Sequence, residues 1–160
     1  MADTRGYYGV VQYCPDASRA EGANVGVLLF CPEAGFLEVR MSRGNDRARR
    51  FFRRDRLDIE RLNAAKSAFE SRIHLAKSEF RTVEDLRHFV DTRANDLRII
   101  PPRPMRVSDP EEDLTKLFTD LVGGRARHSA VPVSELDLLL RAPQVAPRVL
   151  FDQDVTVPGL

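Results

Sequence analysis

Residues 19–30 read RAEGANVGVLLF, and within this stretch a charged, small-residue segment gives way to an almost unbroken apolar run at Asn24. The apolar run over residues 24–31 predicts a strand buried on both faces, because a strand with one solvent-facing side alternates apolar and polar residues. The segment before it predicts a polar loop, in which Gly22 permits backbone conformations that other residues avoid. The sequence therefore predicts a central buried strand that is entered through a polar loop.

Two further strands are predicted on either side of this one. Residues 7–14, YYGVVQYC, are rich in β-branched and aromatic residues and are followed by a proline. Residues 35–42, GFLEVRMS, alternate between apolar and charged side chains, which is typical of a half-buried strand. Only about four residues separate this last strand from residues 24–31, so the two are expected to form an antiparallel hairpin.

The hydrophobic period changes to that of helices after residue 45. Residues 45–56 predict a short helix capped by Asn45 or Asp46, with both Phe51 and Phe52 able to turn inward. Residues 58–80 predict a longer helix, whose apolar stripe follows steps of three and four: Ile59, Leu62, Ala65, Phe69, Ile73 and Ala76. A further helix begins at Thr82, and residues 97–100, LRII, form a short strand. The predicted fold class is α+β, a small antiparallel sheet with an early β-hairpin, covered by two or three central helices, plus a helical C-terminal segment.

The prolines of PPRP, residues 101–104, predict a boundary, because consecutive prolines exclude helix and favour extended chain. We therefore expect a core domain over 1–100, a proline-rich linker over 101–107 and a helical C-terminal segment over 108–160 that packs on the core. Within that segment a helix starts near Pro110 and ends at Gly123 and Gly124. A last helix is expected after Ser134, and residues 147–158 are expected to add an edge strand or a tail.

Composition limits the class of protein. An apolar content of 42% with 31% charged residues is ordinary for a folded domain and argues against disorder. The sequence contains no run of about 18 apolar residues, and MADTRGYYG lacks the apolar core of a secretory signal. We expect no membrane association and a cytoplasmic protein, in which Cys14 and Cys31 are reduced, packed thiols.

Common catalytic signatures are missing from the sequence. It contains no P-loop, no dinucleotide-binding glycine motif, no GxSxG and no HExxH. The histidines His74, His88 and His128 are scattered, and none has a cysteine or histidine at metal-ligand spacing. No catalytic residue, metal or cofactor is expected from these patterns, and an enzyme is not the favoured reading.

The loop at Arg19, Glu21 and Asn24 is the first candidate for function. Loops held by rigid strands often carry binding residues, so these three residues are predicted to contact a protein partner. The alternative is a self-contained turn, in which Glu21 pairs with Arg19 or with another arginine. A third hypothesis is an undetected enzyme site, which would require a deep pocket lined by these three residues and a perturbed carboxylate.

The second candidate is a cluster of arginines, since residues 40–56 hold eight arginines against two acidic residues. If residues 47–56 form one helix, these arginines provide a surface for a nucleic-acid backbone. The residues of this alternative are Arg47, Arg49, Arg50, Arg53 and Arg54. Other interpretations are a solvated face, or a face toward an acidic protein or toward residues 109–113 of the same chain. The net charge of only +1 is unlike that of most nucleic-acid-binding domains.

The opening third of the chain resembles an uncharacterised bacterial family, domain of unknown function number 3037. The resemblance rests on three segments, YGVVQY from Tyr8, RAE from Arg19 and NVGV from Asn24, with the apolar strand behind them. It implies a small cytoplasmic protein of bacterial or phage origin. It further implies a partner-binding accessory of a kinase-like protein, in a toxin–antitoxin or defence system. A homo-oligomer that buries apolar residues near the C-terminus remains open.

Overall fold

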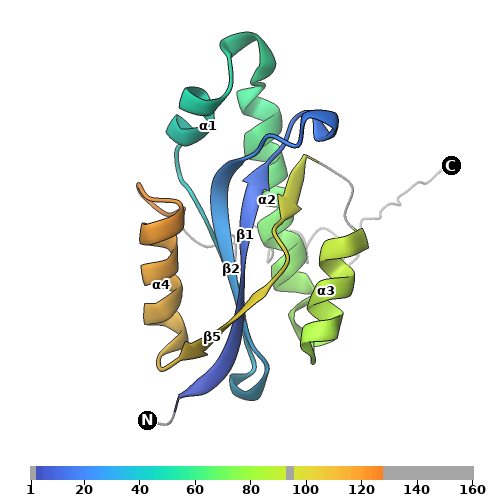
Figure 1. Ribbon diagram of the computed structural model, residues 1–160, viewed down its shortest axis with the longest axis vertical. Coiled ribbons are helices and arrows are strands. Elements are labelled where there is room, and N and C mark those ends of the chain that lie inside the picture. The colour runs from blue at the N-terminus through green and yellow to red at the C-terminus, as the bar shows by residue number, and fades with distance from the viewer. Residues whose placement is uncertain (1–2, 93–95, 128–160) are drawn as a thin grey trace, which may run out of the picture. The chain divides into compact units, whose positions relative to one another are not determined.

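The computed structural model describes residues 3–92 and 96–127 (Figure 1). Its sheet has five strands: β1 Thr4–Tyr13, β2 Ala23–Cys31, β3 Phe36–Met41, β4 Leu97–Ile99 and β5 Arg103–Val107. The strand order is β3-β2-β1-β4, β5 also pairs with β1, and every pairing is antiparallel. The predicted α+β class with its early antiparallel sheet is therefore confirmed.

Strand β1 is the centre of the sheet and pairs with three other strands. Along one edge it pairs with β2, with Tyr7 opposite Phe30 and a bulge between Val11 and Gln12. Along its other edge β4 pairs with the end of β1, and β5 pairs with its beginning. The hairpin between β2 and β3 is also present, and its connection is a 3-10 turn that ends at Gly35, with a φ of 61°. Glycine suits this position because a side chain is strained at such a φ.

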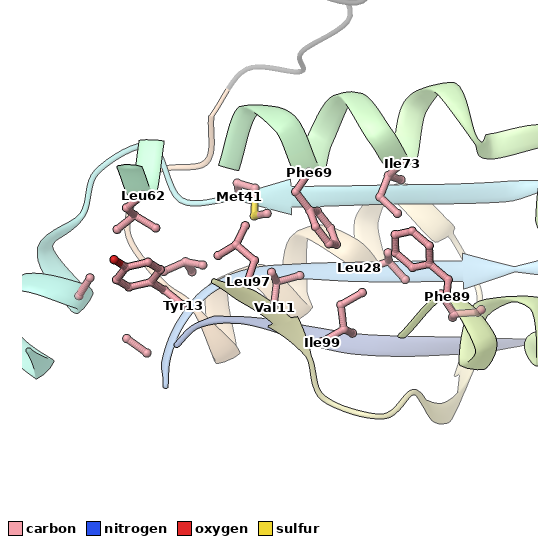
Figure 2. Close-up of a cluster of buried hydrophobic side chains, with 14 of the residues drawn as sticks. Val11, Tyr13, Leu28, Met41, Leu62, Phe69, Ile73, Phe89, Leu97 and Ile99 are labelled. Atoms are coloured by element: carbon pink, nitrogen blue, oxygen red, sulfur yellow. The ribbon is translucent and has the colours of Figure 1, made fainter. Parts of the chain in front are cut away.

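The helices cover both faces of the sheet (Figure 1). They are α1 Asp46–Phe51, α2 Ile59–Leu75, α3 Val83–Thr92 and α4 Pro110–Leu121. Helices α2 and α3 pack on one face, together with the buried side chains of Val11, Leu28 and Met41 (Figure 2). Helix α4 packs on the other face, against Val27 and Leu29. Strand β2 is thus buried on both faces, as its apolar run predicted.

Both cysteines are buried and neither forms a disulfide, as expected. The thiol of Cys14 donates a hydrogen bond to the carbonyl oxygen of Glu21, at 2.9 Å. Burial raises the pKa of the Cys31 thiol to about 11. Because the thiolate is the reactive form of cysteine, Cys31 is a packing residue at neutral pH.

The proline-rich segment differs from its prediction as a linker over 101–107. Its residues Arg103–Val107 form β5, and Pro104 lies opposite Tyr7 of β1. Proline has no backbone N–H to donate. An edge strand tolerates this because the backbone groups on its outer side do not hydrogen-bond to another strand. The prolines predicted an extended chain. They could not predict its pairing as a strand, because the partner β1 is distant in the sequence.

The prediction of an arginine-rich helix over 47–56 is also wrong in its extent. Helix α1 ends at Phe51, and Phe52 is extended, with φ −104° and ψ 147°. This conformation buries the ring of Phe52 edge-on against Tyr13, at 5.7 Å between centroids, whereas Phe51 stays 53% exposed. A continued helix would instead place arginines of like charge three and four residues apart, which is unfavourable. The helix expected after Ser134 and the segment 147–158 lie outside the described residues.

Gly9 of β1 lies in close contact with Ile99 and Ile100, where the chain passes from β4 to β5. A Cβ atom at this position would lie 2.7 Å from Cγ2 of Ile99 and 3.2 Å from the carbonyl oxygen of Ile100. We predict that Gly9→Ala lowers the free energy of unfolding by about 1–3 kcal/mol through overpacking, measured by urea denaturation. The matched control is Gly44→Ala, because a Cβ there meets only an Asp46 side-chain oxygen at 3.7 Å. Equal effects of the two substitutions would contradict the close approach at Gly9.

Candidate functional site

The loop between β1 and β2 is capped by one of its own side chains, that of Asp16. It contains a short 3-10 helix, Ala17–Arg19, and Asp16 accepts hydrogen bonds from the backbone N–H and the hydroxyl of Ser18, at 3.0 and 2.6 Å. These bonds lower the pKa of Asp16. The helix ends at Ala20, whose φ is 55°, so the chain reverses there. The loop therefore presents its charged residues in a fixed arrangement.

Arg19 and Glu21 form a two-point ion pair at the surface of this loop. Nε and Nη2 of Arg19 donate to the two carboxylate oxygens of Glu21, at 3.0 and 3.2 Å. Both side chains are close to half exposed. The hydrogen bond from Arg19 is the main cause that lowers the pKa of Glu21, and the charge of Arg56 adds to it. Glu21 is consequently a stable carboxylate, which is unsuited to general acid catalysis at neutral pH.

A pocket of about 220 Å³ lies beside this ion pair. It brings the loop together with the chain that follows α1, at the same end of the molecule (Figure 1). Phe52 and Pro15 give it an apolar lining, and charges of both signs surround them. The lining residues are Pro15, Asp16, Arg19, Glu21, Phe52 and Arg56. Phe51 is not one of these lining residues; its ring contacts that of Phe52 at 4.9 Å between centroids, and the residue is 53% exposed.

Asn24, the third residue predicted for partner contact, is separate from this pocket. Its Nδ2 donates to the carbonyl oxygen of Leu121 at the end of α4, at 3.0 Å, and its Oδ1 accepts from Gln12 at 2.8 Å. Gln12 in turn accepts two hydrogen bonds from Arg98 of β4. The structure thus brings Arg19 and Glu21 together. The side chain of Asn24 instead hydrogen-bonds β2 to the end of α4.

The five arginines of the nucleic-acid hypothesis do not share one helix face. Arg47 donates to the carbonyl oxygen of Val122 at 2.9 Å, and Arg49 pairs with Asp46 at 3.6 Å. Arg47 and Arg50 line a second pocket, whereas Arg53 and Arg54 lie beyond the end of α1 and are exposed. The interruption at Phe52 divides the cluster into two groups.

The sequence analysis missed a buried lysine on α2. Lys66 is fully buried, and its ammonium donates toward four oxygens at 2.8–2.9 Å: the carbonyls of Ser42 and Gly44, the hydroxyl of Ser42 and Oδ1 of Asn45. Burial lowers the pKa of Lys66 to about 8, the charge of Arg127 contributes in the same direction, and that of Glu70 opposes it. The signal was present, because Lys66 lies four residues after Leu62 and three before Phe69, within the apolar stripe.

Two charged residues surround this lysine. Burial raises the pKa of Glu70, against the opposing charges of Arg127 and Lys66. Oε2 of Glu70 lies 3.2 Å from Nε of Arg127, without an aligned hydrogen bond. The hydroxyl of Ser42 donates to Gly44 and accepts from Lys66, so its proton does not point at the amine. Ser42 and Lys66 are therefore arranged as a structural link between β3 and α2, and their geometry is not that of a nucleophile with its base.

Within residues 3–92 and 96–127, no group of three or more His, Cys, Asp and Glu side chains is placed to hold a metal ion. The helices of the same part of the chain are all too short or too polar to cross a membrane.

Comparison with known proteins gives one match. Residues 8–122 match the family described as "Protein of unknown function (DUF3037)". The match extends from β1 to the end of α4, well beyond the opening third on which the resemblance was based. No curated protein and no solved structure matches the chain.

Proposed function

The chain belongs to the DUF3037 family of proteins of unknown function, and we propose that it is a non-enzymatic protein that binds a protein partner through the pocket beside Arg19 and Glu21. The observation that carries this proposal is the combination of an apolar pocket lining, charges of both signs and an exposed aromatic ring. Protein interfaces typically combine an aromatic or arginine anchor with a polar rim. The two anchors here are Phe51 and Arg56.

Charge and rigidity support the same function. The lining carries two arginines and two acids, so it is close to neutral and suits a partner surface of mixed charge better than a polyanion. The loop is already ordered by Asp16 and by the pair of Arg19 with Glu21, so little conformational entropy is lost when it binds. The lowered pKa values of both carboxylates keep them charged and available for contact.

The resemblance supports the finer part of the proposal. It suggests a cytoplasmic accessory of a kinase-like partner in a toxin–antitoxin or defence system of a bacterium or phage. The first protein to test is therefore the product of the neighbouring gene, co-expressed with the full chain.

The expected result is a stoichiometric complex that Phe51→Ser weakens at least tenfold, since truncation of an aromatic anchor commonly costs more than about 1.4 kcal/mol. Leu75→Ser is the matched control, because Leu75 is also a large apolar residue, 44% exposed, and lies at the far end of α2. Affinity is measured by titration calorimetry with the purified partner.

Two outcomes would count against the proposal. One is a complex that Phe51→Ser and Leu75→Ser weaken equally, which would place the contact elsewhere. The other is light scattering that gives twice the chain mass of 18.1 kDa for the wild type and the single mass for Phe51→Ser, which would assign this surface to self-association.

A further inference from the structure

The second pocket has a different chemistry from the first. It has a volume of about 210 Å³ and lies between the β3–α1 connection, α1 and the turn after α4. Three arginines line it, Arg47, Arg50 and Arg125, together with one acid, Asp46. Asp46 also pairs with Arg49, at 3.6 Å, so the surroundings of the pocket are strongly positive. No second acid lines this pocket, which distinguishes it from the one beside Glu21.

The walls of the pocket are fixed by contacts between distant segments. The guanidinium of Arg47 donates to the carbonyl oxygen of Val122, which holds α1 against the end of α4. The backbone N–H of Arg43 donates to the carbonyl oxygen of Arg125 at 2.7 Å, and Ser42 forms a β-bridge with Ala126. The arginines therefore come from two chain segments that are hydrogen-bonded to each other.

Lys66 adds rigidity and charge behind one wall. Three pocket residues, Ser42, Gly44 and Asn45, supply all four oxygens that surround its ammonium. A buried ammonium at this place fixes the connection between β3 and α1. Because little solvent lies between them, its positive charge is weakly screened from the pocket.

Glycines form part of the pocket wall, and of these the N–H of Gly123 already donates to the carbonyl oxygen of Phe118 at 2.8 Å. Gly44, Gly123 and Gly124 all line it. The φ angles of Gly123 and Gly124 are 78° and 74°, a conformation that residues with a Cβ atom rarely adopt. A Cβ at Gly124 would meet nothing within 4 Å, so the backbone here borders open space. An anion can approach the main chain at such a position.

From this arrangement we propose that the second pocket binds a small phosphate-bearing anion, held by the side chains of Arg47, Arg50 and Arg125. Arginine forms planar two-point hydrogen bonds with phosphate oxygens, which suits several arginines directed at one group. The volume is below the roughly 300–1,000 Å³ of pockets for drug-sized ligands, so a single phosphate group with a small substituent fits better than a large molecule. An extended polynucleotide would need the arginines to continue along a surface, and the cluster is interrupted at Phe52.

The test uses inorganic phosphate as the probe and the full chain. Amide spectra by NMR are recorded during a titration at constant ionic strength, with chloride as the balancing anion. We expect saturable shifts of the N–H signals of Gly44, Gly123 and Gly124. Arg50→Gln and Arg125→Gln should each weaken phosphate binding at least about tenfold, because each removes a charge-assisted contact. Neither variant removes the structural hydrogen bond made by Arg47.

Arg53→Gln is the matched control, since it makes the same change of charge outside the pocket, and it should alter the affinity less than twofold. Phosphate binding that Arg53→Gln weakens as much as Arg50→Gln would overturn the proposal, as would shifts that do not saturate. A ten-nucleotide single strand is titrated in parallel. If it binds and Arg53→Gln and Arg54→Gln weaken it as much as Arg50→Gln does, the arginines serve a nucleic acid and the small-anion site is rejected. These variants leave Phe51 untouched, so this result and the partner result are independent.

Discussion

Replacing Lys66 by methionine is expected to lower the free energy of unfolding by about 3 kcal/mol. Methionine fills a similar volume, so the loss comes from polar groups and not from a cavity. The substitution leaves Oδ1 of Asn45 buried without its donor, and the carbonyl oxygens of Ser42 and Gly44 lose the same ammonium. An unpaired buried acceptor costs about 1–3 kcal/mol, and removing one partner of a buried charged cluster about 3–5 kcal/mol. Since part of this wall borders a pocket that water can enter, we expect the lower end of that range.

Urea denaturation followed by circular dichroism measures this loss, and Lys77→Met is the control. Lys77 is also paired, with Glu38 at 2.7 Å, but both side chains are more than a third exposed. Exposed pairs contribute about 0–1 kcal/mol. If Lys66→Met cost no more than Lys77→Met, the hydrogen bonds around Lys66 would not be stabilising the connection between β3 and α1.

The pH dependence of the free energy of unfolding, compared between the wild type and Lys66→Met, gives a second measurement. The pKa of Lys66 is about 8 in the folded protein, against 10.5 for an ordinary lysine. Between these values the unfolded chain binds more protons, so the free energy of unfolding of the wild type rises with pH relative to Lys66→Met. At about 1.36 kcal/mol per pH unit, the difference between the two proteins should widen by about 2 kcal/mol from pH 8 to pH 10. Tyr13 and Cys31 have raised pKa values but occur in both proteins, so they cancel.

Local patterns in the sequence were enough to predict strands β1 to β4 and helices α2 to α4. The apolar run after Asn24 identified the doubly buried strand β2, and the short connection identified its hairpin with β3. The stripe on α2 correctly identified Leu62, Phe69 and Ile73 as buried. Each of these features depends on residues that are close in the sequence, where periodicity and turn chemistry carry the information.

Features that depend on distant residues were not predictable in this way. The pairing of β5 depends on β1, and the end of α1 depends on the contact of Phe52 with Tyr13. The burial of Lys66 depends on the oxygens of residues 42–45, which only the tertiary fold brings together. Of the predicted partner residues, Arg19 and Glu21 are two apart and their pairing was foreseen as an alternative. The anchoring of Asn24 to Leu121 spans 97 positions, and no local signal indicates it.

The substitution Phe69→Ala is expected to have the largest effect on stability, about 3–5 kcal/mol, because it removes a fully buried ring from the centre of the core. Figure 2 shows Phe69 directed from α2 toward the sheet, between Met41 and Ile73. Its ring lies 6.3 Å from that of Phe89 on α3, which in turn contacts Phe80 at 5.3 Å. Phe69 therefore joins α2, α3 and the sheet, and the cavity left by alanine cannot close without moving all three.

Thermal and urea unfolding measure the effect, and Phe51→Ala is the control that makes the same chemical change at an exposed position. We expect Phe51→Ala to alter the free energy of unfolding by less than about 1 kcal/mol, since Phe51 is already 53% exposed. The two phenylalanines thus separate stability from recognition: Phe69→Ala should unfold the domain more easily, whereas Phe51 substitutions should leave it folded and impair only the partner complex. Comparable losses of stability from both substitutions would show that the end of α1 is part of the core, and would remove the reason for treating Phe51 as a binding anchor.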